Sequence, residues 1–267
     1  MEGKLKVLCL HGFTQNAETF RAKTGSVRKS LKSKVEFVFV DAPHSAAGFF
    51  DDADRSALGT TDGAEHDPVG PRAWWLMGEN DAEDGPARLT EPANETTEGV
   101  ARAAVVRADR EGKSSGEKLP VRPAQSTQMR GWEATERLLR ETADARGPFD
   151  GVLGFSQGAS TAALALATIP ELQATVRFAV LFSGFEPMDP LAAAKLSVPE
   201  NRGGAVRGVR SLHVHGVADQ MISRRRAEAL MGAFEKIPEL FSHEGGHGVP
   251  SSKPFRERLN RFVLEGE

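Results

Sequence analysis

Residues 151–158 read Gly-Val-Leu-Gly-Phe-Ser-Gln-Gly, and this stretch decides the expected fold. An apolar run predicts a short buried strand over 151–154, and an Ala/Leu-rich run predicts a helix over 158–168. Between them, G-x-S-x-G matches a nucleophile elbow, the sharp strand-to-helix turn that exposes a serine. Such a turn strains the serine backbone, and glycines beside it avoid clashes across the bend. Ser156 is therefore a candidate nucleophile; the alternative is a Gly-rich turn with a spectator serine.

Short apolar runs alternate with helical patterns on both sides of this elbow. We expect further strands at 5–10, 35–40, 178–182, 211–215 and 240–242, and further helices at 127–145, 224–237 and 254–264, with Ser223 as a possible N-cap. Strands that alternate with helices imply crossover units and a mostly parallel sheet with helices on both faces. The sequence thus predicts an α/β fold with a mostly parallel central sheet flanked by helices.

Composition is that of an ordinary globular protein. The 267 residues are 39% hydrophobic and 27% charged, and 34 Lys and Arg nearly balance 37 Asp and Glu. This balance gives no electrostatic reason to expect a nucleic acid or an anionic membrane as partner. The single cysteine, Cys9, excludes an internal disulfide framework and a Cys-rich zinc site. Without an apolar run long enough for a membrane span or a secretory signal, we expect a cytoplasmic protein.

One segment departs from the alternating pattern. From about 78 to 125 the chain is polar and charged, with several glycines and prolines and few large apolar residues. Its low apolar content does not offset the entropy of ordering it. We expect one domain over 1–267, with 78–125 as a lid-like or disordered insertion.

A serine nucleophile needs a base, and the base needs an acid that orients it. Asp219 follows the expected strand 211–215, and His247 lies in a glycine-rich loop after the expected strand 240–242. The order Ser156, Asp219, His247 is that of α/β-hydrolases. Either of the last two residues alone would be a surface polar group, but the three in this order favour a catalytic triad.

The oxyanion formed by such a nucleophile needs backbone N–H donors. One is expected from Gln157, the residue after the nucleophile, and a second from Phe13 in the His-Gly-Phe-Thr loop that follows the first strand. His11, at the start of this loop, is expected to hold the loop geometry and not to act as a base.

His243-Glu-Gly-Gly-His247 fits the H-E-x-x-H zinc motif in letters. That motif requires a helix, and the two central glycines with Pro250 nearby disfavour one. We therefore expect no metal and no cofactor. His213 and His215 lie at strand spacing, where they are expected to be core or rim histidines.

Trp74 and Trp75 precede the polar segment. They are expected either to line an acyl pocket and bind substrate or to anchor the long loop to the core. Arg224 to Arg226 is expected to be a solvated helix face.

Six stretches of the chain resemble one family, the FSH-type serine hydrolases of the α/β-hydrolase superfamily, which includes the ovarian-cancer-associated gene 2 esterases. They are LCLHGFTQNAETFRAKTGSVRKSLK at 8–32, VEFVFVDAPH at 35–44, RAWW at 72–75, GPFDGVLGFSQGA at 147–159, SLHVHGVAD at 211–219 and HEGGHGVP at 243–250. The resemblance implies an α/β-hydrolase fold and hydrolysis of carboxylic esters by Ser156, Asp219 and His247 without a metal. It also places Trp74 and Trp75 in the substrate-facing region.

The expected activity is that of a carboxylesterase acting on a small-molecule ester, with the oligomeric state left open. An acyl thioesterase with the same triad, and an inactive hydrolase-fold binding protein, are the alternatives. Fold analogy does not name the substrate.

Overall fold

The computed structural model of the chain describes residues 3–47, 69–77, 123–197 and 204–264. Its centre is one six-stranded sheet in which every neighbouring pair is parallel. The strands, in spatial order, are β2 (Val35–Val40), β1 (Leu5–Leu10), β5 (Gly151–Phe155), β6 (Phe178–Phe182), β7 (Arg210–Gly216) and β8 (Glu239–His243). The predicted parallel α/β fold is confirmed, and it is the α/β-hydrolase fold.

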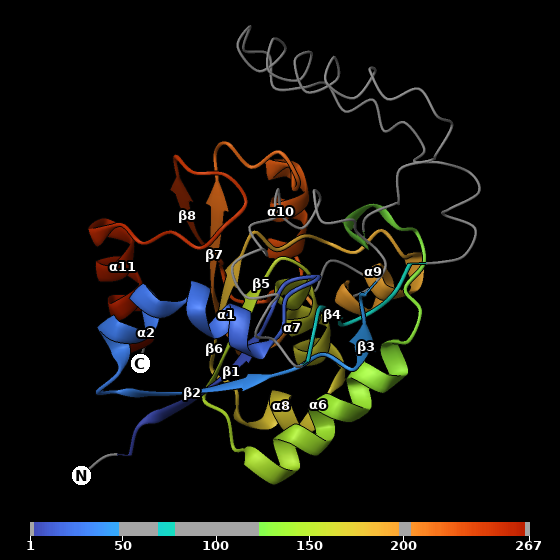
Figure 1. Cartoon of the computed structure of the whole chain (residues 1–267), viewed down its shortest axis with the longest axis horizontal. Coiled ribbons are helices and arrows are strands. Elements are labelled where there is room, and N and C mark those ends of the chain that lie inside the picture. The colour runs from blue at the N-terminus through green and yellow to red at the C-terminus, as the bar shows by residue number, and fades with distance from the viewer. Residues whose placement is uncertain (1–2, 48–68, 78–122, 198–203, 265–267) are drawn as a thin grey trace, which may run out of the picture.

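Helices cover both faces of this sheet (Figure 1). One face carries α1 (Ala17–Lys23), α2 (Gly25–Leu31) and α11 (Lys253–Leu264), whose buried side chains include Phe20, Leu31 and Phe255. The other carries α6 (Trp132–Arg146), α7 (Gln157–Thr168), α8 (Pro170–Thr175), α9 (Pro190–Leu196) and α10 (Arg224–Met231).

The strands supply both cores because successive side chains point to opposite faces of the sheet. In β1, Val7 and Cys9 belong to the core with α1, α2 and α11, whereas Leu8 and Leu10 belong to the core with α7. Burial on both faces explains the apolar run from Val7 to Leu10 in this strand.

Two expected boundaries are wrong. The helix expected over 224–237 ends at Met231, and Gly232, whose backbone is right-handed, is its C-cap residue. Ser223 is the N-cap residue of this helix, but its side chain makes no capping hydrogen bond. The helix expected from residue 127 begins at Trp132, because Gly131 before it has a left-handed backbone with φ of 80°.

Among the described residues, four short α-helices were not expected from the sequence: α1, α2, α8 and α9. Two of them have clear local signals. Asn16 caps α1 by accepting a hydrogen bond from Thr19 N at 2.9 Å, and Asp189 caps α9, with Pro190 in its first turn.

A two-stranded antiparallel sheet, β3 (His44–Ser45) with β4 (Arg72–Ala73), lies beside the main sheet. Residues 78–122 of the expected insertion lie outside the described residues, and its last three form a short 3-10 helix, η2 (Pro123–Gln125). The insertion and the one-domain organisation therefore stay predictions. Within the parts of the chain that the structure describes, none of the helices has the length and apolar character needed to cross a membrane.

Candidate active site

Ser156 occupies the turn between β5 and α7, as the elbow motif predicts. Its backbone has φ of 52° and ψ of −119°, a conformation that residues other than glycine rarely adopt. The N–H of Ser156 donates a hydrogen bond to the carbonyl of Phe182 in β6 at 2.8 Å. The expected strain is present, and the neighbouring strand stabilises it.

The two glycines of the elbow are required by close approach. A Cβ on Gly154 would lie 2.5 Å from the carbonyl oxygen of Gly158. A Cβ on Gly158 would lie 2.2 Å from the carbonyl oxygen of Leu10 and 2.3 Å from that of His11. The glycines thus let α7 start directly against both the elbow strand and the loop after β1.

Ser156, Asp219 and His247 come together in the structure. The Nδ1 atom of His247 lies 2.8 Å from Oδ2 of Asp219, and its Nε2 lies 3.0 Å from Oγ of Ser156. An ionised carboxylate only accepts hydrogen bonds, so Nδ1 carries the proton and Nε2 is left as the acceptor for the serine hydroxyl. This arrangement can activate a serine oxygen as a nucleophile.

The parallel topology explains why residues so distant in sequence meet. Ser156 follows β5, Asp219 follows β7 and His247 follows β8, and the carboxyl ends of parallel strands lie at one edge of the sheet. The ring of Phe155 packs against the His247 imidazole with a centroid distance of 5.0 Å, which restricts the imidazole further.

Asp219 is set up to remain ionised. Its side chain is fully buried, and burial by itself would raise its pKa. Hydrogen bonding from His247 and from the backbone N–H groups of Met221 and Ile222, at 2.9 and 3.0 Å, outweighs burial and holds the pKa of Asp219 below its usual value. The carboxylate thus stays available to orient the imidazole.

Hydrogen bonds made by His11 and Thr14 hold the loop that follows β1 in place. Nε2 of His11 accepts from Ala42 N at 3.0 Å, and Nδ1 donates to the carbonyl of Gly12 at 2.7 Å. Burial lowers the pKa of His11 to about 4, in keeping with a neutral ring. The backbone N–H of Thr14 donates to Arg72 O at 2.9 Å. His11 therefore holds the loop, as expected, and this loop, which contains Phe13, begins against the elbow, where the carbonyl oxygens of Leu10 and His11 face Gly158.

Trp74 and Trp75 lie in the hydrophobic core, with 0% and 1% of their surface exposed. The indole N–H of Trp74 donates to the carbonyl of His11 at 2.8 Å, and Trp75 packs edge-on against Phe185. This burial matches the interpretation that the two residues anchor their segment to the core. A role for them in binding substrate stays a prediction.

The side chain of Gln157 has a function that sequence reasoning missed. Its Oε1 accepts from Trp74 N and its Nε2 donates to Trp75 O, both at 2.9 Å. The residue after the nucleophile therefore fixes the 74–75 segment against the start of α7. A glutamine in this position carries no sequence signal for such a contact, because the partners are more than 80 residues away.

The H-E-x-x-H segment is not a helix, as expected: β8 ends at His243, and bends follow. Nδ1 of His243 accepts from Gly245 N at 3.2 Å. Among the described residues, no group of three His, Cys, Asp or Glu side chains is arranged to hold a metal ion. His213 and His215 are buried in β7, and burial lowers the pKa of His213 to about 3.

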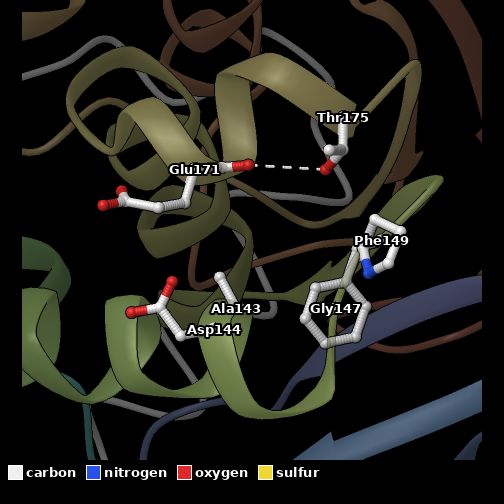
Figure 2. Close-up of a pocket in the computed structure, with 7 residues that line it drawn as sticks. Ala143, Asp144, Gly147, Phe149, Glu171 and Thr175 are labelled. Carbon is white, nitrogen blue, oxygen red and sulfur yellow. Dashed lines mark hydrogen bonds between the residues drawn. The ribbon is translucent and has the colours of Figure 1, made fainter.

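A pocket of about 280 Å³ lies between the end of α6 and α8 (Figure 2). Asp144, Phe149 and Glu171 are among its lining residues. It adjoins the residues that lead into β5, whereas Ser156 follows the other end of that strand. The pocket therefore lies at the amino end of β5 and Ser156 at its carboxyl end, so the pocket and the serine belong to different surfaces.

Known proteins resemble this chain over nearly its whole length. The family model described as "Serine hydrolase (FSH1)" matches residues 1–259. Esterase C25G4.2 of Caenorhabditis elegans is 32% identical over 266 residues, covering 98% of this chain and 94% of that protein. Esterase OVCA2 of Homo sapiens is 31% identical over 267 residues, covering 97% and 95%.

Solved structures agree at the level of the fold. The crystal structure of TT1662 from Thermus thermophilus has a TM-score of 0.52 and 21% identity, and the match covers 98% of this chain and 88% of that one. At this identity the likeness concerns the architecture alone.

Proposed function

The chain belongs to the serine hydrolase (FSH1) family, and we propose that it is a carboxylesterase that uses Ser156, His247 and Asp219 as its catalytic triad. One observation carries the proposal. The imidazole of His247 lies between the serine hydroxyl at 3.0 Å and the Asp219 carboxylate at 2.8 Å. The curated relatives named above are called esterases, which supports an ester as the substrate class.

In the proposed acylation step, Ser156 Oγ attacks the acyl carbon while Nε2 of His247 takes the hydroxyl proton. The imidazolium that forms is stabilised by Asp219. As the tetrahedral intermediate collapses, the C–O bond to the leaving alcohol breaks and His247 returns the proton to that alcohol. An acyl-enzyme on Ser156 remains.

The negative charge on the intermediate needs N–H donors. We assign these to the backbone of Gln157 and Phe13. The N–H of Gln157 lies in the first turn of α7, where helix N–H groups have no carbonyl partner within the helix and the helix dipole favours an anion. Phe13 lies in the loop that His11 and Arg72 hold in place.

Deacylation repeats the same chemistry with water. His247 Nε2 takes a proton from the water molecule that attacks the acyl carbon, and Ser156 leaves with that proton. The products are a carboxylic acid and the regenerated serine. No step requires a metal or a cofactor.

Covalent labelling tests the proposal. A fluorophosphonate should label Ser156, and Ser156→Ala or His247→Ala should lower kcat on the order of a millionfold because triad residues act as a unit. Ser33→Ala, at an exposed serine, is the control and should behave as wild type. Substantial esterase activity in Ser156→Ala would contradict the assignment. A panel of esters and thioesters on wild type decides between the esterase and a thioesterase.

A further inference from the structure

The loop that carries Asp219 and the loop that carries His247 are joined backbone to backbone. The N–H of Val217 donates to the carbonyl of His243 at 2.7 Å, and the N–H of Ala218 donates to that of Gly245 at 3.2 Å. The ladder between β7 and β8 ends at the pair Gly216 and His243. The two bonds therefore continue the contact between the strands into the loops that lead to the triad.

Gly216 lies at a close approach between the end of β7 and the loop that carries His247. A Cβ on Gly216 would lie 2.3 Å from the carbonyl oxygens of both Gly245 and Gly246, a distance that real Cβ atoms essentially never show. The atoms in the way are backbone atoms, which cannot rotate aside as the end of a flexible side chain can.

The backbone conformation of Gly216 does not itself require glycine. Its φ lies outside the range of +20° to +160° in which other residues are strained. An alanine could therefore adopt this backbone conformation. What excludes alanine is the lack of room for its Cβ beside the carbonyl oxygens of Gly245 and Gly246. The requirement for glycine comes from the loop that carries His247.

We propose that Gly216 is a positioning residue for the reaction: its missing Cβ allows the His247 loop to lie against the end of β7, and this contact sets the distance from His247 to Ser156. The inference rests on the proposed function. Gly246 directly precedes His247, so any displacement of its carbonyl moves the imidazole as well.

The size of the displacement follows from the distances. An ordinary Cβ contact begins at 3.4 Å, so the carbonyls at 2.3 Å have to move by about 1 Å. A misplacement of about 1 Å in a catalytic group can cost about a hundredfold in rate. Since Gly216 does not touch the substrate in this scheme, the loss should fall on kcat and not on KM.

The test compares Gly216→Ala with Gly248→Ala. Gly248 follows His247 directly, but a Cβ there would have no atom of the described residues within 4 Å, and its backbone is not left-handed. Gly216→Ala should lower kcat on the order of a hundredfold with KM within about threefold of wild type. Its rate of fluorophosphonate labelling should fall in parallel, and the imidazole Nδ1 proton of His247 should lose its downfield NMR signal. Gly248→Ala should retain all three properties.

Two kinetic outcomes would overturn the inference. One is a kcat for Gly216→Ala within about threefold of wild type. The other is an equal loss of kcat in Gly248→Ala, because the loop would then be sensitive to any added side chain and not to the contact at Gly216. If Gly216→Ala does not fold, amide hydrogen exchange in wild type decides. The amides of Val217 and Ala218 should be protected, and exchange at unprotected rates would contradict the joined loops.

The outcomes also separate this inference from the proposed function. Wild type that does not hydrolyse esters, or an active Ser156→Ala, refutes the proposed function whatever Gly216→Ala does. Wild type whose activity depends on Ser156, together with a fully active Gly216→Ala, refutes the positioning role alone.

Discussion

Gln157 accepts a hydrogen bond from the backbone N–H of Trp74 through its side-chain oxygen at 2.9 Å. The amide nitrogen of the same side chain donates to the carbonyl of Trp75, also at 2.9 Å. The oxygen and the nitrogen of one side-chain amide thus take the place of the backbone groups that would bond to residues 74 and 75 in a β-sheet. Because the backbone of Gln157 follows the nucleophile, the same residue connects the elbow to a distant part of the core.

Replacing Gln157 with leucine should destabilise the fold. The change leaves a buried N–H and a buried carbonyl without partners, and each such group costs about 1–3 kcal/mol. We expect a loss of roughly 2–6 kcal/mol in the free energy of unfolding, measured by urea denaturation. Gln173→Leu, on the exposed side of α8, is the control and should stay within about 0.5 kcal/mol of wild type. Equal stability of the two variants would show that the hydrogen bonds to the tryptophan segment contribute nothing.

Asp219→Asn should reduce activity without unfolding the protein. The amide oxygen of asparagine can still accept from Met221 N and Ile222 N, but the amide group no longer forces Nδ1 of His247 to carry the proton. We expect kcat to fall about ten-thousandfold. Asp144→Asn, in the pocket at the far edge of the sheet, should leave kcat unchanged. A variant Asp219→Asn with wild-type turnover would remove this carboxylate from the mechanism.

Stability should decrease in mild acid because of two buried histidines. Burial lowers the pKa of His11 to about 4 and that of His213 to about 3. Both folded values lie below the unfolded value near 6.5, so the unfolded state binds more protons below that pH. The free energy of unfolding should fall as pH drops from about 6.5 toward 4, by up to roughly 1.4 kcal/mol per pH unit for each histidine.

His213→Leu tests this dependence on pH. The variant should lose about half of the slope that the two histidines produce between pH 6.5 and 4, that is, roughly 1.4 kcal/mol per pH unit. Gln173→Leu changes no titratable group and should keep the wild-type slope. An unchanged slope in His213→Leu would mean that this histidine is not held neutral by the fold.

Two left-handed glycines should respond differently to alanine. Gly70 has φ of 69°, and a Cβ there would have no atom of the described part of the chain within 4 Å, whereas Gly131 has φ of 80° and its Cβ would lie 2.5 Å from the His44 ring. Gly70→Ala should cost about 1–2 kcal/mol from backbone strain alone. Gly131→Ala should cost roughly 1–3 kcal/mol more, because the ring also has to move and its hydrogen bond to Gly131 O, at 2.8 Å, is then disturbed. Equal losses in urea denaturation would contradict the clash.

Removal of metal ions should leave the esterase activity unchanged. Both ring nitrogens of His247 lie within hydrogen-bond distance of triad partners, and Nδ1 of His243 accepts from Gly245 N. The two histidines of the zinc-like motif therefore do not present a pair of free nitrogens on one helix face. Assays in EDTA, with and without added zinc, check this. Loss of activity in EDTA that zinc restores would contradict it.

The sequence by itself determined the features that depend on local pattern. The apolar runs of β1, β2 and β6 and the order of strand, elbow and helix around Ser156 were predictable, because periodicity and glycine placement act over a few residues. The sequence also identified Asp219 and His247 as candidate partners, since each follows an expected strand. Helix ends were less certain, as the early end of α10 at Met231 shows.

Only the tertiary structure decided the features that depend on close approach between distant segments. The sequence did not show whether Trp74 and Trp75 are buried, and the contacts with Gln157 and His11 place both side chains in the core. The close contact at Gly216 exists only because β7 and β8 pair in one register. This pairing brings the loop that carries His247 against the backbone of Gly216. Such contacts are set by how the strands align in space, and no pattern of neighbouring residues records that alignment.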